Sequence, residues 1–193
     1  MKEREQKCLL TKRQHRKLCE FVKVFYKYNI ACDTQTNYYY DTLDLFFDRN
    51  QTTVRIREKD GNRVGTIKIH AVTEYDCSEE ILFDVDEIPA KLDYQEKELF
   101  LHGALITHRI SVPIHPDIIL CLDENHYLGM VDYELEIEYK EGYHAETWRW
   151  LMFISMILHK GRYQAARRLR YASNKSARFF ARLKKKERKN DWR

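Results

Sequence analysis

The segment Tyr133–Tyr139 reads Tyr-Glu-Leu-Glu-Ile-Glu-Tyr, and its strict alternation is typical of a β-strand. Its apolar and aromatic side chains would lie on one face, with Glu134, Glu136 and Glu138 on the other. Neighbouring glutamates would be about 7 Å apart and would repel by about 0.6 kcal/mol in water, or about 2.4 kcal/mol at an effective dielectric constant near 20. The pattern fits either a sheet edge with a solvated acidic face or a semi-enclosed acidic wall that needs a cation.

The composition indicates one domain with reduced cysteines. The chain has 193 residues, of which 44% are hydrophobic and 33% charged, enough to bury a substantial core. Its five cysteines are dispersed and form no C-x-x-C pair: Cys8, Cys19, Cys32, Cys77 and Cys121. This spacing favours reduced thiols in a cytoplasmic protein over a disulfide framework or a zinc site. The sequence contains no signal segment and no apolar run long enough to span a bilayer, so we expect no membrane association.

The net charge of +4 conceals a strong asymmetry along the chain. Residues 160–193 carry fourteen Lys and Arg against two acids, which leaves twenty basic and twenty-eight acidic residues in 1–159. We interpret the basic segment as a solvated helix face and tail rather than as a nucleic-acid contact. The prediction is a single domain over residues 1–183, followed by a flexible basic tail over 184–193.

Periodicity separates predicted helices from predicted strands. Helices are expected over Thr11–Lys27, Asp93–His102 and Glu141–Leu158, with a last one capped by Ser173 or Asn174. Alternating segments predict strands at Lys2–Leu9, Tyr38–Asp41, Leu45–Phe47, Thr53–Lys59, Arg63–His70, Glu80–Val85, Ala104–Ile114, Asp117–Glu124 and Tyr133–Tyr139.

The two strands on either side of the Asp60-Gly61 turn each have an apolar side and a charged or polar side. The polar sides carry Arg55, Arg57 and Lys59 on the first strand and Thr66, Lys68 and His70 on the second. Among the eight histidines, His70 is the one whose phase places it beside these cations.

Strands in two runs, with helices between and after them, predict an α+β protein. The count and the alternation suit an eight-stranded antiparallel closed β-barrel with helices packed on the outside. The apolar faces would then lie under the helices, and the charged faces would point into the lumen. Burying charges of both signs seldom offsets their desolvation, so such a lumen indicates a wet site for a highly charged ligand.

These motifs, in this order, resemble the CYTH superfamily, the triphosphate tunnel metalloenzymes. The resemblance rests on Glu3-x-Glu5-x-Lys7, Gln35–Thr42, Val54-Arg55-Ile56-Arg57, Thr66-Ile67-Lys68, Asp123 with Gly129 and Glu134–Glu138, and Asn174–Phe179. One such motif is a weak signal, but six in family order over residues 3–179 are a strong one. The chain is most similar to the compact bacterial CYTH proteins that lack a fused CHAD domain. The resemblance implies an eight-stranded β-tunnel, bound Mg²⁺ or Mn²⁺, and substrates that end in a triphosphate.

The resemblance also implies roles for individual residues in a metal-dependent triphosphatase that removes the terminal phosphate of inorganic triphosphate or a small organic triphosphate. The implied substrate-binding residues are Lys7, Arg55, Arg57, Lys68 and Arg109. The implied metal ligands are Glu3, Glu5, Asp123, Glu134, Glu136 and Glu138, since carboxylates are the hard ligands that Mg²⁺ prefers. The implied catalytic residues are Glu5, Lys7 and Arg57. Further candidates are Glu80 and Lys175.

Several alternatives stay open at this point. Within the family, a class IV-type adenylyl cyclase is the alternative enzyme, and a polyphosphate- or nucleotide-binding module without turnover is the alternative outside catalysis. Two of Glu134, Glu136 and Glu138 are expected to bind metal, without a choice between them. In the segment Asp76–Val85, the acid that points into the barrel is Glu79 or Glu80. The alternation of the apolar residues Ile81, Phe83 and Val85 favours Glu80. Lys175 and Arg178 are expected to stabilise the last helix rather than to contact the substrate, and the oligomeric state is open.

Overall fold

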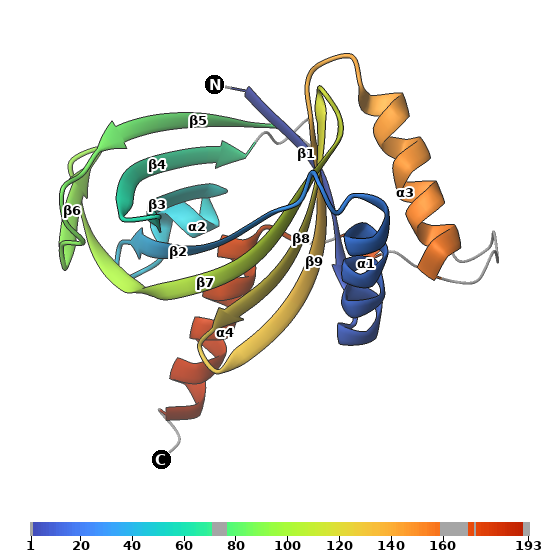
Figure 1. Ribbon diagram of the computed structural model, residues 1–193. Coiled ribbons are helices and arrows are strands. Elements are labelled where there is room, and N and C mark those ends of the chain that lie inside the picture. Colours follow the sequence, from blue (N-terminus) through green and yellow to red (C-terminus); the bar gives the residue numbers. More distant parts are fainter. Residues whose placement is uncertain (1, 71–76, 159–169, 172, 191–193) are drawn as a thin grey trace.

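Ten strands and four helices make up residues 2–70, 77–158, 170–171 and 173–190, which the computed structural model describes (Figure 1). The strands are β1 (Lys2–Leu10), β2 (Ala31–Asp41), β3 (Thr52–Lys59), β4 (Asn62–His70), β5 (Cys77–Asp84), β6 (Lys91–Tyr94), β7 (Lys97–His115), β8 (Ile118–Tyr127), β9 (Met130–Tyr139) and β10 (Arg170–Tyr171). The helices are α1 (Lys12–Phe25), α2 (Phe46–Arg49), α3 (His144–Leu158) and α4 (Lys175–Asn190).

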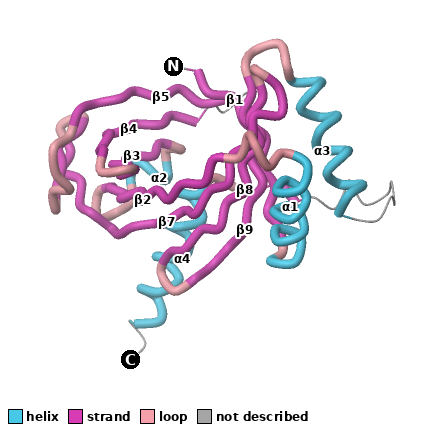
Figure 2. The backbone as a smooth tube through the Cα atoms, in the orientation of Figure 1, coloured by secondary structure: helices cyan, strands magenta, loops and turns pink. Residues whose placement is uncertain are grey.

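The antiparallel sheet runs in the order β1-β5-β4-β3-β2-β7-β8-β9 and curls into a half-barrel (Figures 1 and 2). The α+β prediction is confirmed, but the structure does not show the closed barrel that the strand count favoured. The reason lies in β1, which divides its length between two neighbours. Residues Lys2–Arg4 pair with β5 and Glu5–Leu10 pair with β9, so only three residue pairs join β1 to β5 within the described residues. That ladder is too short to close the sheet along its length.

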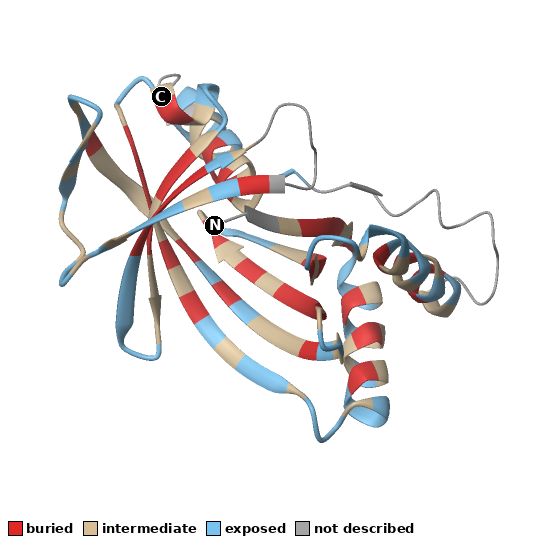
Figure 3. Cartoon of the chain, turned by 90° about the horizontal axis from the view of Figure 1, so that it is seen from above, coloured by how far each residue is buried: buried red, intermediate tan, exposed pale blue. Residues whose placement is uncertain are grey.

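Alternation along the strands separates the two faces of the half-barrel, as Figure 3 shows by the change of burial from residue to residue. In β9, Leu135 and Ile137 are fully buried on the convex face, where they join the largest apolar core. Helices α1 and α3 cover this face beside β1, β8 and β9 (Figure 1). The glutamates of β9 therefore point to the concave face, because successive side chains of a strand alternate.

Helix α1 begins at the predicted capping box. The Thr11 hydroxyl accepts from the Gln14 backbone N–H at 3.2 Å, and the Gln14 side chain accepts from the Thr11 N–H at 2.8 Å. The helix then buries Leu18 and Val22 against the sheet. The cap and the apolar spacing are both local signals, so this prediction is confirmed.

Helix α4 packs against one end of the concave face. Phe179 lies 5.0 Å from Tyr39 between ring centroids and also contacts the ring of Tyr127. Gly103 on β7 has φ of +140°, and a Cβ there would meet the Phe179 ring at 3.1 Å. The glycine thus permits both the backbone conformation and the close approach of the helix. This packing brings the first turn of α4 to the concave face.

Two predicted elements are wrong. Asp93–His102 is a hairpin of β6 and β7 rather than a helix, with Gln95 and Glu96 at positive φ in its turn. The predicted strand Leu45–Phe47 is instead the start of α2, because the Asp41 carboxylate accepts from the backbone N–H groups of Phe47 and Asp48 at 2.9 and 2.8 Å. Both elements depend on contacts between residues apart in the sequence, which the hydrophobic pattern of the segment itself cannot predict.

The basic C-terminal segment is more helical than expected. Helix α4 continues through Lys184 to Asn190, because this stretch is rich in helix-forming Lys, Arg and Glu and contains no Gly or Pro. Residues 160–169, 172 and 191–193 of the segment lie outside the described part of the chain. None of the helices in the described residues is long and apolar enough to cross a membrane.

Candidate functional site

The concave face of the half-barrel contains a narrow charged cavity of about 60 Å³ that opens to solvent. Six strands (β1, β2, β3, β4, β7 and β9) and the start of α4 contribute to it. The lining residues are Glu5, Lys7, Gln35, Tyr39, Thr53, Arg55, Arg57, Lys68, His70, Arg109, Glu136, Glu138, Asn174, Lys175 and Ser176. Strand alternation produces this lining, since each strand places every second side chain on the concave face.

One wall of the cavity contains three buried carboxylates, which we call the acidic trio: Glu136, which lines the cavity, and Asp123 and Glu134 behind it. They come from the neighbouring strands β8 and β9, and one oxygen from each lies within 4.8 Å of the other two. Their side chains are at most 5% exposed. Three convergent carboxylate oxygens are a suitable ligand set for Mg²⁺ or Mn²⁺, so the acidic trio could hold a metal ion.

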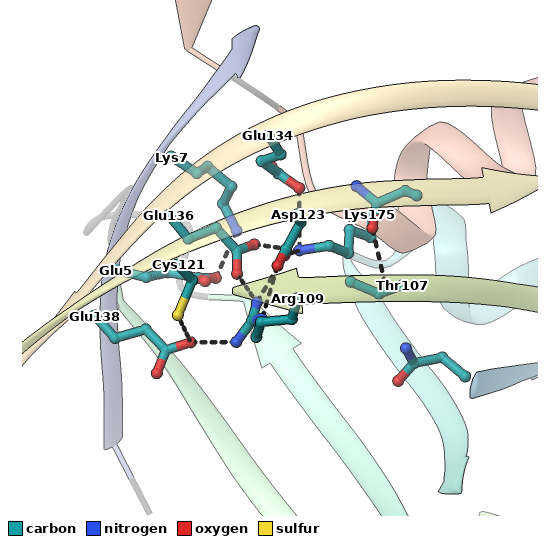
Figure 4. Close-up of polar contacts among 12 residues, drawn as sticks. Glu5, Lys7, Thr107, Arg109, Cys121, Asp123, Glu134, Glu136, Glu138 and Lys175 are labelled. Atoms are coloured by element: carbon teal, nitrogen blue, oxygen red, sulfur yellow. Dashed lines mark hydrogen bonds and ion pairs between the residues drawn. The ribbon is translucent and has the colours of Figure 1, made fainter. Parts of the chain in front are cut away.

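Arg178 binds Glu134 of the acidic trio, and two further cations, Arg109 and Lys175, bind it as Figure 4 shows. The Arg109 guanidinium is bidentate to Asp123, with Nε–Oδ1 and Nη2–Oδ2 both at 2.8 Å, and also contacts Glu136. The Lys175 ammonium contacts all three carboxylates of the trio. Burial would raise the pKa of Glu136, but Lys175 and Arg109 outweigh it and hold that pKa well below its usual range. Glu136 is therefore ionised.

A second group of charges lies around Glu5. The Lys7 ammonium donates to Glu5 Oε1 at 2.5 Å, and Lys68 Nζ lies 3.4 Å from the same oxygen. Burial would raise the pKa of Glu5, but the two lysines lower it to about 2. Lys68 and Arg55 also reach Glu80, at 3.5 and 3.4 Å. Glu80 is thus on the concave face, as its apolar neighbours favoured, whereas Glu79 is exposed.

The opposite wall carries positive charge that the protein does not fully neutralise. Arg57 donates through Nε to Asn37 Oδ1 at 3.1 Å, and no carboxylate of the described residues lies within 4.0 Å of its guanidinium. The neighbouring Arg55, together with burial, lowers the pKa of Arg57 to about 10. Burial and Lys68 likewise lower the pKa of His70 to about 4, so this ring is neutral at pH 7. Arg55 Nε is buried and has no hydrogen-bond partner in the part of the chain that the structure describes. This wall therefore carries a surplus of positive charge that a bound anion would offset.

The structure brings together nearly all of the residues that the sequence singled out. Glu136, Glu138 and Arg109 line the cavity, whereas Asp123 and Glu134 lie fully buried behind it. Glu3 pairs with Ser78 through its backbone, and its side chain lies outside the described residues.

Lys175, which the sequence offered as a further site candidate and as a residue that stabilises the last helix, lies at the cavity. Its ammonium is in the acidic trio and its side chain lines the cavity. The local spacing of α4 contains no sign of this, because the contact joins residues 39 positions apart. Arg178 does anchor α4 as expected, with its guanidinium on Asp132 at 2.9 Å and on Glu134 at 2.8 Å.

Sequence reasoning missed five neutral lining residues: Gln35, Tyr39, Thr53, Asn174 and Ser176. Strand phase was the available signal for three of them, since Thr53 shares a face with Arg55, and Gln35 shares one with Tyr39. The hydroxyls of Thr53 and Ser176 are 2.7 Å apart, which ties β3 to the first turn of α4. Only the docking of the helix reveals that contact.

Facing walls of carboxylates and of arginine and lysine side chains define a class of protein that binds a polyanion together with a cation. The CYTH domain model matches residues 1–168, and the chain belongs to the CYTH family. No curated protein matches the chain significantly.

Solved structures share the fold. A proposed adenylate cyclase from Bacillus halodurans is 24% identical with a TM-score of 0.67, and the match covers 93% of this chain and 98% of that one. A proposed adenylyl cyclase from Hippeastrum is 20% identical with a TM-score of 0.63, covering 93% and 95%. The triphosphatase of the Mimivirus capping enzyme is 13% identical with a TM-score of 0.58, covering 82% and 89%. At these identities the likeness is one of fold.

Proposed function

We propose that this protein hydrolyses the terminal phosphate of inorganic triphosphate or a small organic triphosphate, with Mg²⁺ or Mn²⁺. The observation that carries the proposal is Arg57, a half-buried guanidinium facing a cavity without a carboxylate partner among the described residues. Arg55 and burial lower the pKa of Arg57 to about 10, because the two neighbouring guanidinium groups repel each other. A bound polyanion would relieve that repulsion.

The chemistry of the walls suits a triphosphate. Such a group carries about four negative charges, and arginines bind phosphate oxygens through two parallel N–H groups. Arg55 and Arg57, on the wall opposite the acidic trio, would bind the phosphate chain. Lys7 and Lys68 would contact it from the side of Glu5. In the absence of substrate both lysines pair with Glu5, so they can exchange one anionic partner for another.

The carboxylates fit the metal that the family implies. Glu5, Glu136 and Glu138 line the cavity, and Asp123 and Glu134, the other two members of the acidic trio, lie behind it. Mg²⁺ or Mn²⁺ held there would neutralise phosphate charge and lower the pKa of a bound water. Glu5 has a pKa of about 2, so it is a permanent anion at neutral pH and suits the orientation of charge and water better than the storage of a proton.

Two relatives support triphosphate hydrolysis. The Hippeastrum protein, a proposed adenylyl cyclase, is described as having a dominant triphosphatase activity, and the Mimivirus enzyme is a triphosphatase. The Bacillus halodurans protein is described as a proposed adenylate cyclase, which favours cyclisation of ATP as the second candidate function.

A substrate panel tests the proposal. Phosphate release would be measured by a malachite-green assay with tripolyphosphate, thiamine triphosphate, ATP and GTP, each with Mg²⁺ or Mn²⁺ and with EDTA. We expect metal-dependent release from at least one. Cyclic AMP from ATP in the same samples would favour the cyclase. Tight calorimetric binding without any product, by a protein with a normal circular dichroism spectrum, would contradict the enzyme proposal in favour of a binding module.

A further inference from the structure

The ammonium of Lys175 lies where a metal ion in the acidic trio would lie. Its Nζ is 2.8 Å from Asp123 Oδ2, 3.0 Å from Glu134 Oε2 and 2.5 Å from Glu136 Oε1. A lysine ammonium has three N–H donors, and each carboxylate of the trio can accept one of them. The three residues that could bind metal are therefore the same three that hold this lysine.

Each carboxylate of the acidic trio already pairs with cations of the protein. Asp123 binds Arg109 through two hydrogen bonds, Glu134 binds the Arg178 guanidinium at 2.8 Å, and the ammonium of Lys175 joins all three carboxylates. Arg109 and Arg178 also bind Glu138 and Asp132, so Lys175 is the cation that the trio does not share. A divalent cation entering the trio would meet this ammonium at contact distance and be repelled.

We propose that Lys175 is a tethered competitor of the metal ion: its ammonium occupies the acidic trio when metal is absent, and metal enters the trio only as the ammonium leaves. The first turn of α4 can stay in place during the exchange. Ser176 is held to Thr53 at 2.7 Å, and Arg178 is held to Asp132 and Glu134. The four-carbon side chain of Lys175 is then the part that moves.

The displaced ammonium has a place to go, because Lys175 already lines the cavity beside Asn174 and Ser176. There it would add one positive charge to the phosphate-binding surface. Metal loading would thus prepare the cavity for the anion, and this second step rests on the proposed function. Competition for the acidic trio does not, since it involves only the protein and the metal.

Metal titrations without any triphosphate test the competition. Mn²⁺ binding would be measured by calorimetry and by the electron paramagnetic resonance signal of free Mn²⁺, for the wild type, Lys175→Ala and Lys184→Ala. Lys184 is a matched control, because it lies on the same helix and makes one lysine–carboxylate pair, with Asp48 at 2.8 Å, away from the cavity lining. We expect Lys175→Ala to bind Mn²⁺ at least tenfold more tightly and Lys184→Ala to match the wild type. Equal or weaker binding by Lys175→Ala would overturn the proposal.

A second measurement separates displacement from a simple change of charge, and it needs no variant. The wild type would be acetylated briefly with an amine reagent, with and without Mg²⁺, and digested for mass spectrometry. We expect Lys175 to become at least threefold more reactive with Mg²⁺, and Lys184 to stay unchanged. Protection of Lys175 that is the same with saturating Mg²⁺ would show that the metal does not displace it. Neither result depends on phosphate release, so failure here leaves the proposed hydrolysis standing, and the reverse also holds.

Discussion

Replacing Arg57 with alanine should weaken substrate binding while leaving the fold at least as stable. In the proposed complex the guanidinium makes two charged hydrogen bonds to phosphate, worth about 1.5 kcal/mol each. Their loss should raise KM for the best substrate by about 100-fold, or about 3 kcal/mol, with a smaller fall in kcat.

Truncation of a buried side chain usually lowers the free energy of unfolding, but Arg57→Ala should leave it level or raise it. Arg55 and burial lower the pKa of Arg57 to about 10 in the folded protein. At neutral pH Arg57 is charged in both the folded and the unfolded protein. Because its pKa is lower in the folded protein, keeping the charge there lowers the free energy of unfolding by about 3 kcal/mol. Loss of the hydrogen bond to Asn37 and of side-chain packing removes about 1–2 kcal/mol of stability. We therefore expect the free energy of unfolding to stay level or rise by up to about 2 kcal/mol.

The assay pairs steady-state phosphate release with urea unfolding, using Arg63→Ala as the matched control. Arg63 lies on the same hairpin, but its guanidinium binds Glu58 at 2.8 Å on the exposed side. We expect Arg63→Ala to keep the wild-type KM. An Arg57→Ala variant that keeps its KM while losing stability would refute the reasoning, because Arg57 would then be a structural residue and not an anion-binding one.

Three further predictions follow from single contacts. Glu5→Gln should lower kcat at least 100-fold while circular dichroism stays unchanged, since the neutral amide is a weaker metal ligand and lacks the negative charge of the carboxylate. Activity near that of the wild type would place the acidic wall elsewhere. Lys7 and Lys68 lower the pKa of Glu5 in the folded protein to about 2, despite burial. The contribution of Glu5 to stability is therefore present above about pH 4.5 and is lost as the pH falls towards 2. In urea unfolding from pH 6 to pH 2, the free energy of unfolding should decline less for Glu5→Gln than for the wild type. Gly103→Ala should lower the free energy of unfolding by about 2 kcal/mol, because it combines a positive φ with a contact to Phe179, and an unchanged melting curve would contradict this.

The errors in the sequence-based fold have identifiable causes. Asp93–His102 lacks a turn-forming Gly or Pro, yet Gln95 and Glu96 adopt positive φ because β6 pairs with β7 and Leu99 is fully buried. The start of α2 likewise depends on the Asp41 carboxylate capping it from the preceding strand. In each case a tertiary contact overrode a local preference.

Site residues follow the same division. Arg55, Arg57 and Lys68 could be assigned to one surface from strand phase alone, since the period of a strand is a local property. Their surplus of positive charge could not be predicted, because it depends on where the carboxylates of β1, β5 and β9 come to lie. Glu5 and Glu80 reach Lys68 only in the curled sheet, as a result of pairings between distant segments.

The segment Tyr133–Tyr139 shows most clearly what the sequence determined by itself. Alternation placed its three glutamates on one face and Leu135 and Ile137 on the other, since peptide geometry alone sets that period. Which glutamates reach the cavity was decided only by the tertiary structure. Glu136 and Glu138 line it, while Glu134 is sealed beneath α4 by Lys175 and Arg178. Helix α4, about forty residues later in the chain, makes this distinction through Lys175 and Arg178. The alternation of side chains along a strand cannot predict such a contact.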